Sequence, residues 1–257
     1  MTKAPIQAGR PPLGLVMKSL LRADFMVLFN SRTSLFLSML LPIVILLANT
    51  FGKSQGRLGG SSMVIGLALT LGLLTSGLFG YTLALAHDRD VGVLQRLRVT
   101  PSPAWTIMTS GVLVQVTVNL IASIIVIIVA ATAYGLSLKP WQYLLVIAVA
   151  ILGAAMFLAI GQAIVGLIQS TSAINAISRI LLIILLLLGL LGGTGILGDT
   201  IKSIASWSPV GALMTLFADT LNGTAWSAPD TNALLACIGY IAVFSLIGVR
   251  WFRWTSR

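Results

Sequence analysis

The feature that most constrains this chain is a series of six long apolar stretches separated by short polar segments. The hydrocarbon core of a bilayer is about 30 Å thick, and an α-helix needs roughly 20 apolar residues to cross it. In lipid, only helices and closed barrels satisfy every backbone polar group. The stretches that meet this length are Thr33–Phe51, Ser62–Ala86, Pro103–Tyr134, Trp141–Ile168, Ile180–Leu197 and Asn232–Val249. The sequence therefore predicts an all-α, polytopic membrane protein with about six transmembrane helices.

Composition argues against a soluble fold of the same length. Only 9% of the residues are charged and 57% are hydrophobic, whereas soluble domains carry about 25% charged residues. The single cysteine, Cys237, excludes a disulfide within the chain. It lies in an apolar stretch, where we interpret it as a packing residue.

The distribution of basic residues predicts the orientation in the membrane. Of the 16 Lys and Arg residues, 12 flank the stretches on the side of the two termini, and the other four are Lys53, Arg57, Lys139 and Lys202. Cytoplasmic flanks of membrane proteins carry the excess of Lys and Arg. We therefore expect both termini in the cytoplasm of a cell whose plasma or inner membrane holds the chain. The net charge of +10 is interpreted as this topology signal, and nucleic acid is not expected as a partner.

The chain divides into a leader, a membrane domain and a tail. Residues 1–32 form the leader, in which the apolar positions of Leu13–Asn30 share one face with Lys18 and Arg22 on another. This pattern predicts an amphipathic helix on the inner membrane surface, with a plain basic leader as the alternative. Residues 33–250 form the membrane domain, and residues 251–257 form a cytoplasmic tail.

The outer segment 198–231 lies between the last two predicted spans. Within it, Ser208 and Pro209 suit the cap and first position of a helix, and Gly223 suits its end. The helix between them would have about 13 residues, which is too short to span. We expect it to be re-entrant or interfacial.

None of the six predicted spans contains Asp, Glu, His, Lys or Arg. Carriers driven by protons or sodium usually bury an ionisable residue, although coupling through backbone carbonyls stays open. The chain also lacks a complete phosphate-binding loop, a cluster of metal-ligand residues and a catalytic triad. We therefore expect no catalytic residue, cofactor or metal in this chain, and an energy source outside it.

Two further sets of residues within the spans are candidates for function. Rows of small residues allow close helix packing, either between subunits or within the bundle; their members include Gly72, Ser76, Gly80, Gly189 and Gly193. Polar side chains in the middle spans either line a substrate path or bond neighbouring helices; these are Thr75, Gln115, Asn119 and Gln162.

The cytoplasmic loop 87–102 carries the clearest positive signal. Its acidic residues come first and its basic residues last, which suits a helix dipole, and Val91, Leu94 and Leu97 form an apolar stripe. A short amphipathic helix of this kind could dock in the groove of a partner, and a solvated connector is the alternative. The candidate residues are Asp88, Arg89, Asp90, Val91, Gly92, Leu94, Arg96, Leu97, Arg98 and Pro101.

At this loop the sequence resembles the type-2 ABC transporter permeases, whose pattern is like E-R-E-x-G-T-L-E-x-L-x-V-T-P. Asp88-Arg89-Asp90 stands for the acidic-Arg-acidic start, and Gly92, Leu94, Leu97, Val99, Thr100 and Pro101 match directly. Gln95 replaces the second Glu, and Val93 replaces the Thr. The resemblance extends over nearly the whole chain, from the basic leader and a first span containing Pro42 to Ser208-Pro209 before the last span.

The resemblance implies the membrane subunit of an ATP-driven exporter for drug-like molecules, lipids or saccharides, closest in appearance to small antibiotic or lipid exporters. It implies separate ATPase subunits that bind ATP and Mg and meet the loop, with Arg89, Arg96 and Arg98 facing carboxylates at the rim of their groove. It also implies a second permease subunit, identical or related. A gradient-driven carrier or channel, and a membrane assembly factor without transport, remain the alternatives.

Overall fold

The structure, a computed structural model, describes most of the chain from Gly60 onward and parts of the segment before it. The described residues are 14–15, 17–19, 21–22, 26, 40, 42–49, 60–92, 104–136, 138–194 and 199–251. Within these ranges the backbone is helical apart from short turns, with no strand. This confirms the predicted all-α class.

The described helices from Ser61 onward are named here in chain order. They are α3 (Ser61–Leu73), η1 (Leu74–Gly80), α4 (Tyr81–Asp90), α6 (Ala104–Tyr134), α7 (Pro140–Leu167), α8 (Thr171–Thr194), α9 (Asp199–Trp207), α10 (Pro209–Asn222) and α11 (Ala228–Trp251). Of these, α3, η1 and α4 are continuous and form a single rod.

Five of these helical rods are long and apolar enough to cross a membrane. They are the α3–η1–α4 rod, α6, α7, α8 and α11, and they correspond to the second to sixth predicted spans. The predicted first span, Thr33–Phe51, lies largely outside the described residues, although residues 40 and 42–49 within it are helical. The predicted surface helix Leu13–Asn30 also lies largely outside them.

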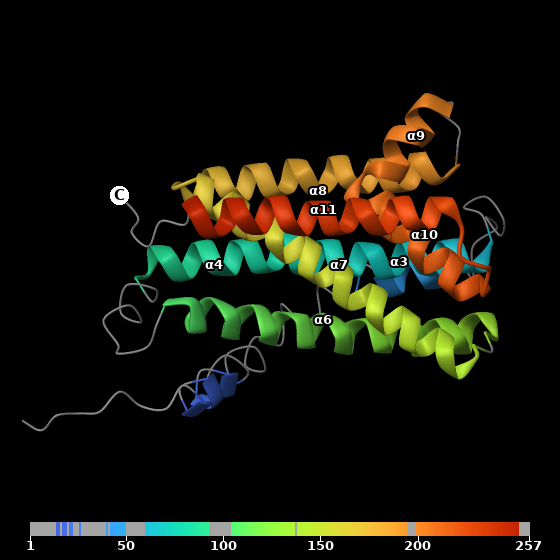
Figure 1. The fold of residues 1–257 in the computed structure, drawn as a ribbon, viewed down its shortest axis with the longest axis horizontal. Coiled ribbons are helices and arrows are strands. Elements are labelled where there is room, and N and C mark those ends of the chain that lie inside the picture. The colour runs from blue at the N-terminus through green and yellow to red at the C-terminus, as the bar shows by residue number, and fades with distance from the viewer. Residues whose placement is uncertain are drawn as a thin grey trace, which may run out of the picture.

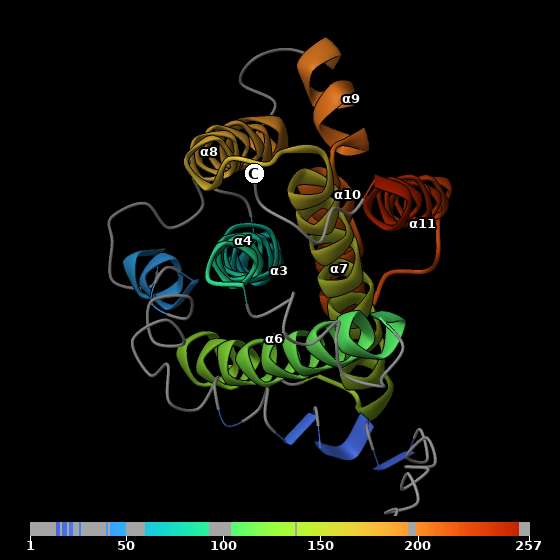
Figure 2. The ribbon, with the colours of Figure 1, turned by 90° about the vertical axis from the view of Figure 1, so that its left-hand side faces the viewer.

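The rods run roughly along one long axis, and α7 crosses the bundle obliquely (Figure 1). Seen from one end, the α3–η1–α4 rod lies at the centre, with α6, α7 and α8 around it and α11 beyond α7 (Figure 2). The α3–η1–α4 rod is the most buried of the five, whereas α8 and α11 are the least buried. Movement of the central rod would therefore disturb packing against several neighbours at once.

The small residues of the spans pack mainly within the chain. A Cβ built at Gly72 would lie 3.0 Å from Cγ of Pro42, and one built at Gly189 would lie 2.5 Å from Cγ1 of Val210. Ser76 accepts a hydrogen bond from Gln115. The interpretation as ordinary packing within the bundle therefore accounts for Gly72, Ser76 and Gly189. A Cβ built at Gly80 would contact only its own helix. The surroundings of Gly193 are outside what the structure describes.

The middle of the central rod is a π-helix, η1, which the sequence did not predict. Such segments are rare, and they often lie at functional sites. Gly77 in η1 packs closely on α7, because a Cβ there would lie 3.1 Å from Cβ of Phe157. The π-helix therefore lies in close contact with α7.

The segment between α8 and α11 contains the predicted short helix and one more. Ser208 caps α10 by accepting a hydrogen bond from the backbone N of Gly211 at 3.1 Å, Pro209 occupies the first turn, and Gly223 ends the helix with φ of +66°. Only glycine adopts this left-handed conformation without strain. The sequence missed α9, which precedes α10. The α10 helix is deeply buried against α3, α7, α8 and α11.

Three predicted span boundaries need correction. The α3–η1–α4 rod continues to Asp90 rather than ending at Ala86, so it contains Asp88, Arg89 and Asp90. The α8 helix begins at Thr171 rather than Ile180, and it contains Arg179. The α11 helix begins at Ala228 rather than Asn232, and it contains Asp230. The absence of ionisable residues holds for the predicted boundaries but not for the full helices. Arg179 is exposed near the start of α8, where a long side chain can extend its charge toward water.

Candidate functional site

The loop singled out by the sequence begins at the end of α4. The described part covers His87 to Gly92, and Gly92 has φ of +75° in the turn that ends the helix. Val91, the first residue of the apolar stripe, is exposed. The other predicted loop residues lie outside the described residues; they are Leu94, Arg96, Leu97, Arg98 and Pro101.

Arg89 is buried within the bundle, with only 1% of its surface exposed. Its guanidinium donates hydrogen bonds from Nη1 to the backbone oxygens of Val165 at 2.8 Å and Ile168 at 3.0 Å. Nη2 donates to the backbone oxygen of Gln169 at 2.7 Å. All three acceptors lie at or just beyond the end of α7.

This arrangement has a clear physical cause. The last carbonyl groups of a helix have no partner within it and carry the negative end of the helix dipole. The planar guanidinium presents several donors in a fixed geometry, so it can satisfy several carbonyls together. Arg89 therefore caps α7 from a different helix. The expectation that Arg89 faces carboxylates at the rim of a partner is wrong, because its side chain faces the interior.

Asp90, the next residue, contacts the start of α8. Its Oδ2 accepts a hydrogen bond from the hydroxyl of Thr171, the first residue of that helix. A carboxylate at a helix N-terminus is favoured by the positive end of the helix dipole. Arg89 and Asp90 thus join the end of α4 to the end of α7 and to the start of α8.

The four polar residues proposed for a substrate path differ in their partners. Gln115 donates to Oγ of Ser76 at 3.0 Å, and Gln162 donates to the hydroxyl of Tyr81 at 3.0 Å. Thr75 donates to carbonyls of its own helix. Asn119 is 1% exposed, and neither its amide nitrogen nor its amide oxygen has a hydrogen-bond partner among the described residues. Hydrogen bonds between helices therefore explain why Gln115 and Gln162 lie in the bundle. They do not explain the burial of Asn119.

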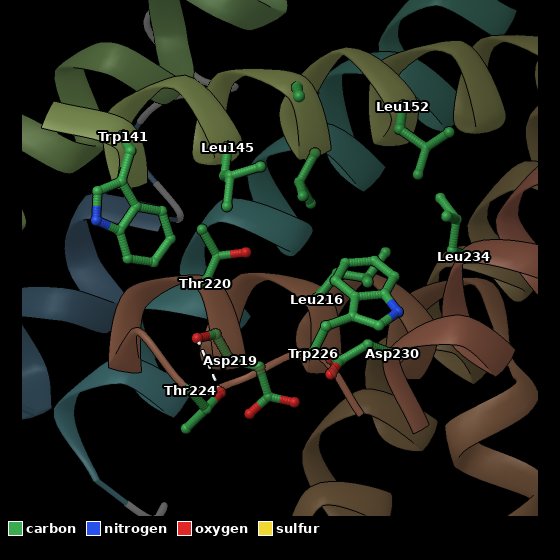
Figure 3. A pocket seen from close by; sticks show the side chains of 12 residues that line it. Trp141, Leu145, Leu152, Leu216, Asp219, Thr220, Thr224, Trp226, Asp230 and Leu234 are labelled. Carbon is green, nitrogen blue, oxygen red and sulfur yellow. Dashed lines mark hydrogen bonds between the residues drawn. The ribbon is translucent and has the colours of Figure 1, made fainter. Parts of the chain in front are cut away.

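A cavity of about 270 Å³ lies at the other end of the bundle, between α7, α10 and α11 (Figure 3). Its lining contains the indole rings of Trp141 and Trp226 and the carboxylates of Asp219 and Asp230. Two threonines and several apolar side chains complete it. Asp230 is buried and accepts hydrogen bonds at Oδ2 from the backbone N and the hydroxyl of Ser227, at 2.8 and 2.7 Å.

Burial raises the pKa of the Asp219 carboxyl above its usual value, and the neighbouring Asp230 carboxyl raises it further. The lining contains no Lys or Arg. The four polar candidates from the sequence do not line this cavity. The sequence did not single out the two aspartates, because they are brought together only by the packing of α10 against α11.

The fold defines a multi-pass helical membrane protein, and comparison with known proteins identifies its family. The model of the family described as ABC-2 family transporter protein matches residues 48–250. The chain belongs to this family, and it is a membrane subunit of an ABC transporter rather than the subunit that hydrolyses ATP. No curated protein matches the chain significantly in sequence.

Proposed function

We propose that this chain is the permease subunit of an exporter that moves a drug-like, lipid or saccharide substrate outward. ATP and Mg are bound by a separate ATPase subunit, which meets the loop 87–102. One observation supports this mechanism most: the loop directly continues the most buried rod of the bundle, which ends at Asp90. A push on the loop is therefore applied to the centre of the permease.

The apolar stripe of the loop is the proposed contact with the ATPase. Val91 is exposed where the described part of the stripe begins, and Leu94 and Leu97 continue it at the same spacing. Leu94→Ala removes a central anchor, which can cost about 2 kcal/mol of binding free energy or more. Leu94→Asp has a larger effect, because it places an unpaired charge in the contact.

The test is affinity purification of the tagged permease from its native membrane, followed by quantification of the bound ATPase. We expect both Leu94 variants to lose ATPase subunits, or to retain them while hydrolysing ATP without export. Arg257→Glu, in the tail, is the control and keeps the wild-type level. Full export and full ATPase retention by Leu94→Asp would refute the coupling role of the loop.

The proposed orientation places both termini and the loop 87–102 in the cytoplasm, in the plasma or inner membrane. It rests on the 12 basic residues on that side against four on the other, out of 16. Reporter fusions after Arg257 and near Gly56 test it. We expect a cytoplasmic signal from Arg257 and an external one from Gly56; a cytoplasmic signal from Gly56 would overturn the topology.

The complete transporter, in this proposal, contains two permease subunits and two ATPase subunits. The broad apolar surfaces of α8 and α11 then face lipid or the second permease subunit. Within the permease, Asn119 is the strongest of the four candidates for the substrate path, because its buried amide lacks a partner among the described residues.

A further inference from the structure

We propose that Arg89 and Asp90 form an internal latch, which makes the ends of α4 and α7 and the start of α8 move together when the ATPase acts on the loop. The inference rests on the proposed function, since it concerns how the stroke received by the loop is transmitted. It assigns the side chains of these two residues to contacts within the permease, buried for Arg89 and exposed for Asp90, rather than to contacts with the ATPase.

The burial of Arg89 is costly unless its donors are satisfied. A charged side chain removed from water loses its hydration, and it is tolerated only when paired or hydrogen-bonded. Three bonds of 2.7 to 3.0 Å to the carbonyls of Val165, Ile168 and Gln169 offset that cost. Hydrogen bonds with a charged donor are roughly twice as strong as neutral ones.

These bonds make independent movement of α4 and α7 unfavourable. If the end of α4 moved away alone, the guanidinium and three backbone oxygens would lose their partners in the same step. A buried donor or acceptor left without a partner loses its hydration with no bond in return, and this cost is largest for the charged guanidinium. The lower-energy response is for the end of α7 to follow the end of α4.

Asp90 extends this connection to α8. It is adjacent to Arg89 in sequence, yet it contacts Thr171 beyond the turn that joins α7 to α8. The two residues therefore hold both sides of the same turn, residues 168–170. In a bundle where α4 and α8 also pack against one another, this arrangement couples the two helices through the turn.

A purely stabilising role predicts different behaviour. The Nε of Arg89 is buried and has no hydrogen-bond partner among the described residues, and a buried ionic group is often less stabilising than a packed apolar one. The arrangement fits better with holding three helix ends in a fixed relation. Breaking such a latch leaves the movement of α4 and removes the coupled movement of α8, whereas a general loss of stability weakens both movements.

The experiment uses the complete complex of permease and co-purified ATPase in lipid nanodiscs. Cys237→Ala removes the only cysteine, and spin labels are then placed at exposed positions in pairs. The first pair, Ala84→Cys with Thr132→Cys, reports movement of α4 against the far end of α6. The second pair, Ser172→Cys with Thr132→Cys, reports movement of α8. Pulsed electron spin resonance measures both distances without nucleotide and after trapping with ATP and vanadate.

In the wild type, we expect ATP trapping to shift both distances. In Arg89→Ala, the α4 shift remains and the α8 shift is largely lost, because only the bond between Asp90 and Thr171 still joins the two helix ends. Arg89→Lys retains more of the α8 shift, because an ammonium can still donate to these carbonyls. Thr171→Val, which removes only the bond to Asp90, reduces the α8 shift. Arg179→Ala, an exposed arginine of α8, is the matched control and keeps both shifts.

Both shifts persisting in Arg89→Ala would overturn the latch and leave the proposed function standing. If Arg89→Ala does not assemble, Arg89→Lys and Thr171→Val decide the question, and wild-type shifts in both would overturn it. The absence of any ATP-induced shift in the wild-type complex would instead contradict the proposed function itself.

Discussion

Replacing Asn119 by Leu should stabilise the resting protein, although the change removes a polar residue from the interior. Leu has the same number of side-chain heavy atoms as Asn, and it leaves no polar atom to satisfy. Each orphaned polar group in a buried position costs about 1–3 kcal/mol, and both amide atoms of Asn119 are orphaned among the described residues. Before packing is considered, the free energy of unfolding should therefore rise by several kcal/mol, as the sum of two such costs.

Packing reduces this gain. The side-chain nitrogen of Asn119 lies beside Gly77 of η1, 3.7 Å from the place where a Cβ would stand, and a methyl group is larger than an amide nitrogen. Overpacking of this kind costs about 1–3 kcal/mol. We expect Asn119→Leu to raise the free energy of unfolding by about 1–2 kcal/mol, as the balance of these terms.

The assay is reversible unfolding in mixed micelles, followed by circular dichroism. Gln115→Leu is the comparison, because it breaks a bond to Ser76 and should lower the free energy of unfolding by about 1 kcal/mol. If Asn119→Leu lowered stability as much as Gln115→Leu, the amide of Asn119 would have to be satisfied, and the reasoning would fail. If Asn119 lines the substrate path, the stabilised variant should also show altered substrate-stimulated ATP hydrolysis in the complex.

Two other predictions concern the opposite end of the bundle. Gln142 is buried, accepts a bond from the backbone N of Lys139 and donates to the carbonyls of Thr220 and Leu221; Gln142→Ala should lower the free energy of unfolding by about 2–3 kcal/mol, measured by the same assay. Asp219→Asn should raise thermal stability near neutral pH. Folding raises the pKa of Asp219, so the folded state is favoured while this carboxyl is protonated. That contribution to stability is fully present below the usual carboxyl pKa and is lost as the pH rises through the folded-state pKa. The advantage of Asp219→Asn should therefore vanish below about pH 4, and an equal advantage at all pH values would contradict this assignment.

Local signals allowed the sequence to predict several features correctly. The length of the apolar stretches identified the helices, and the cap at Ser208, the proline after it and Gly223 located α10 to within a residue. Each of these signals acts over a few neighbouring residues. The boundary at the start of α8 was misplaced, because Arg179 was taken as the limit of the apolar stretch although an exposed arginine is tolerated within the helix.

The features missed by the sequence depend on contacts distant along the chain. The acceptors of Arg89 lie 76 to 80 residues away, so the neighbouring sequence could not identify α7 as the helix that its guanidinium caps. The pairing of Asp219 with Asp230 depends on α10 folding back against α11. The π-helix η1 has no distinctive composition, and its wider turn is visible only in the backbone. For Arg89, the available signal was an arginine at the end of an otherwise apolar helix, next to acidic residues.

The dependence of transport on an ATPase subunit is tested most directly by purifying the complex and measuring hydrolysis. The tagged chain is isolated from its native membrane, reconstituted in nanodiscs and assayed for vanadate-sensitive ATP hydrolysis, with Leu94→Asp in parallel. We predict that a P-loop ATPase co-purifies with the wild-type chain, that the complex hydrolyses ATP, and that Leu94→Asp loses the ATPase or the coupled export. A chain that purifies without any ATPase, and whose transport persists without ATP but stops when ion gradients are dissipated, would contradict the account.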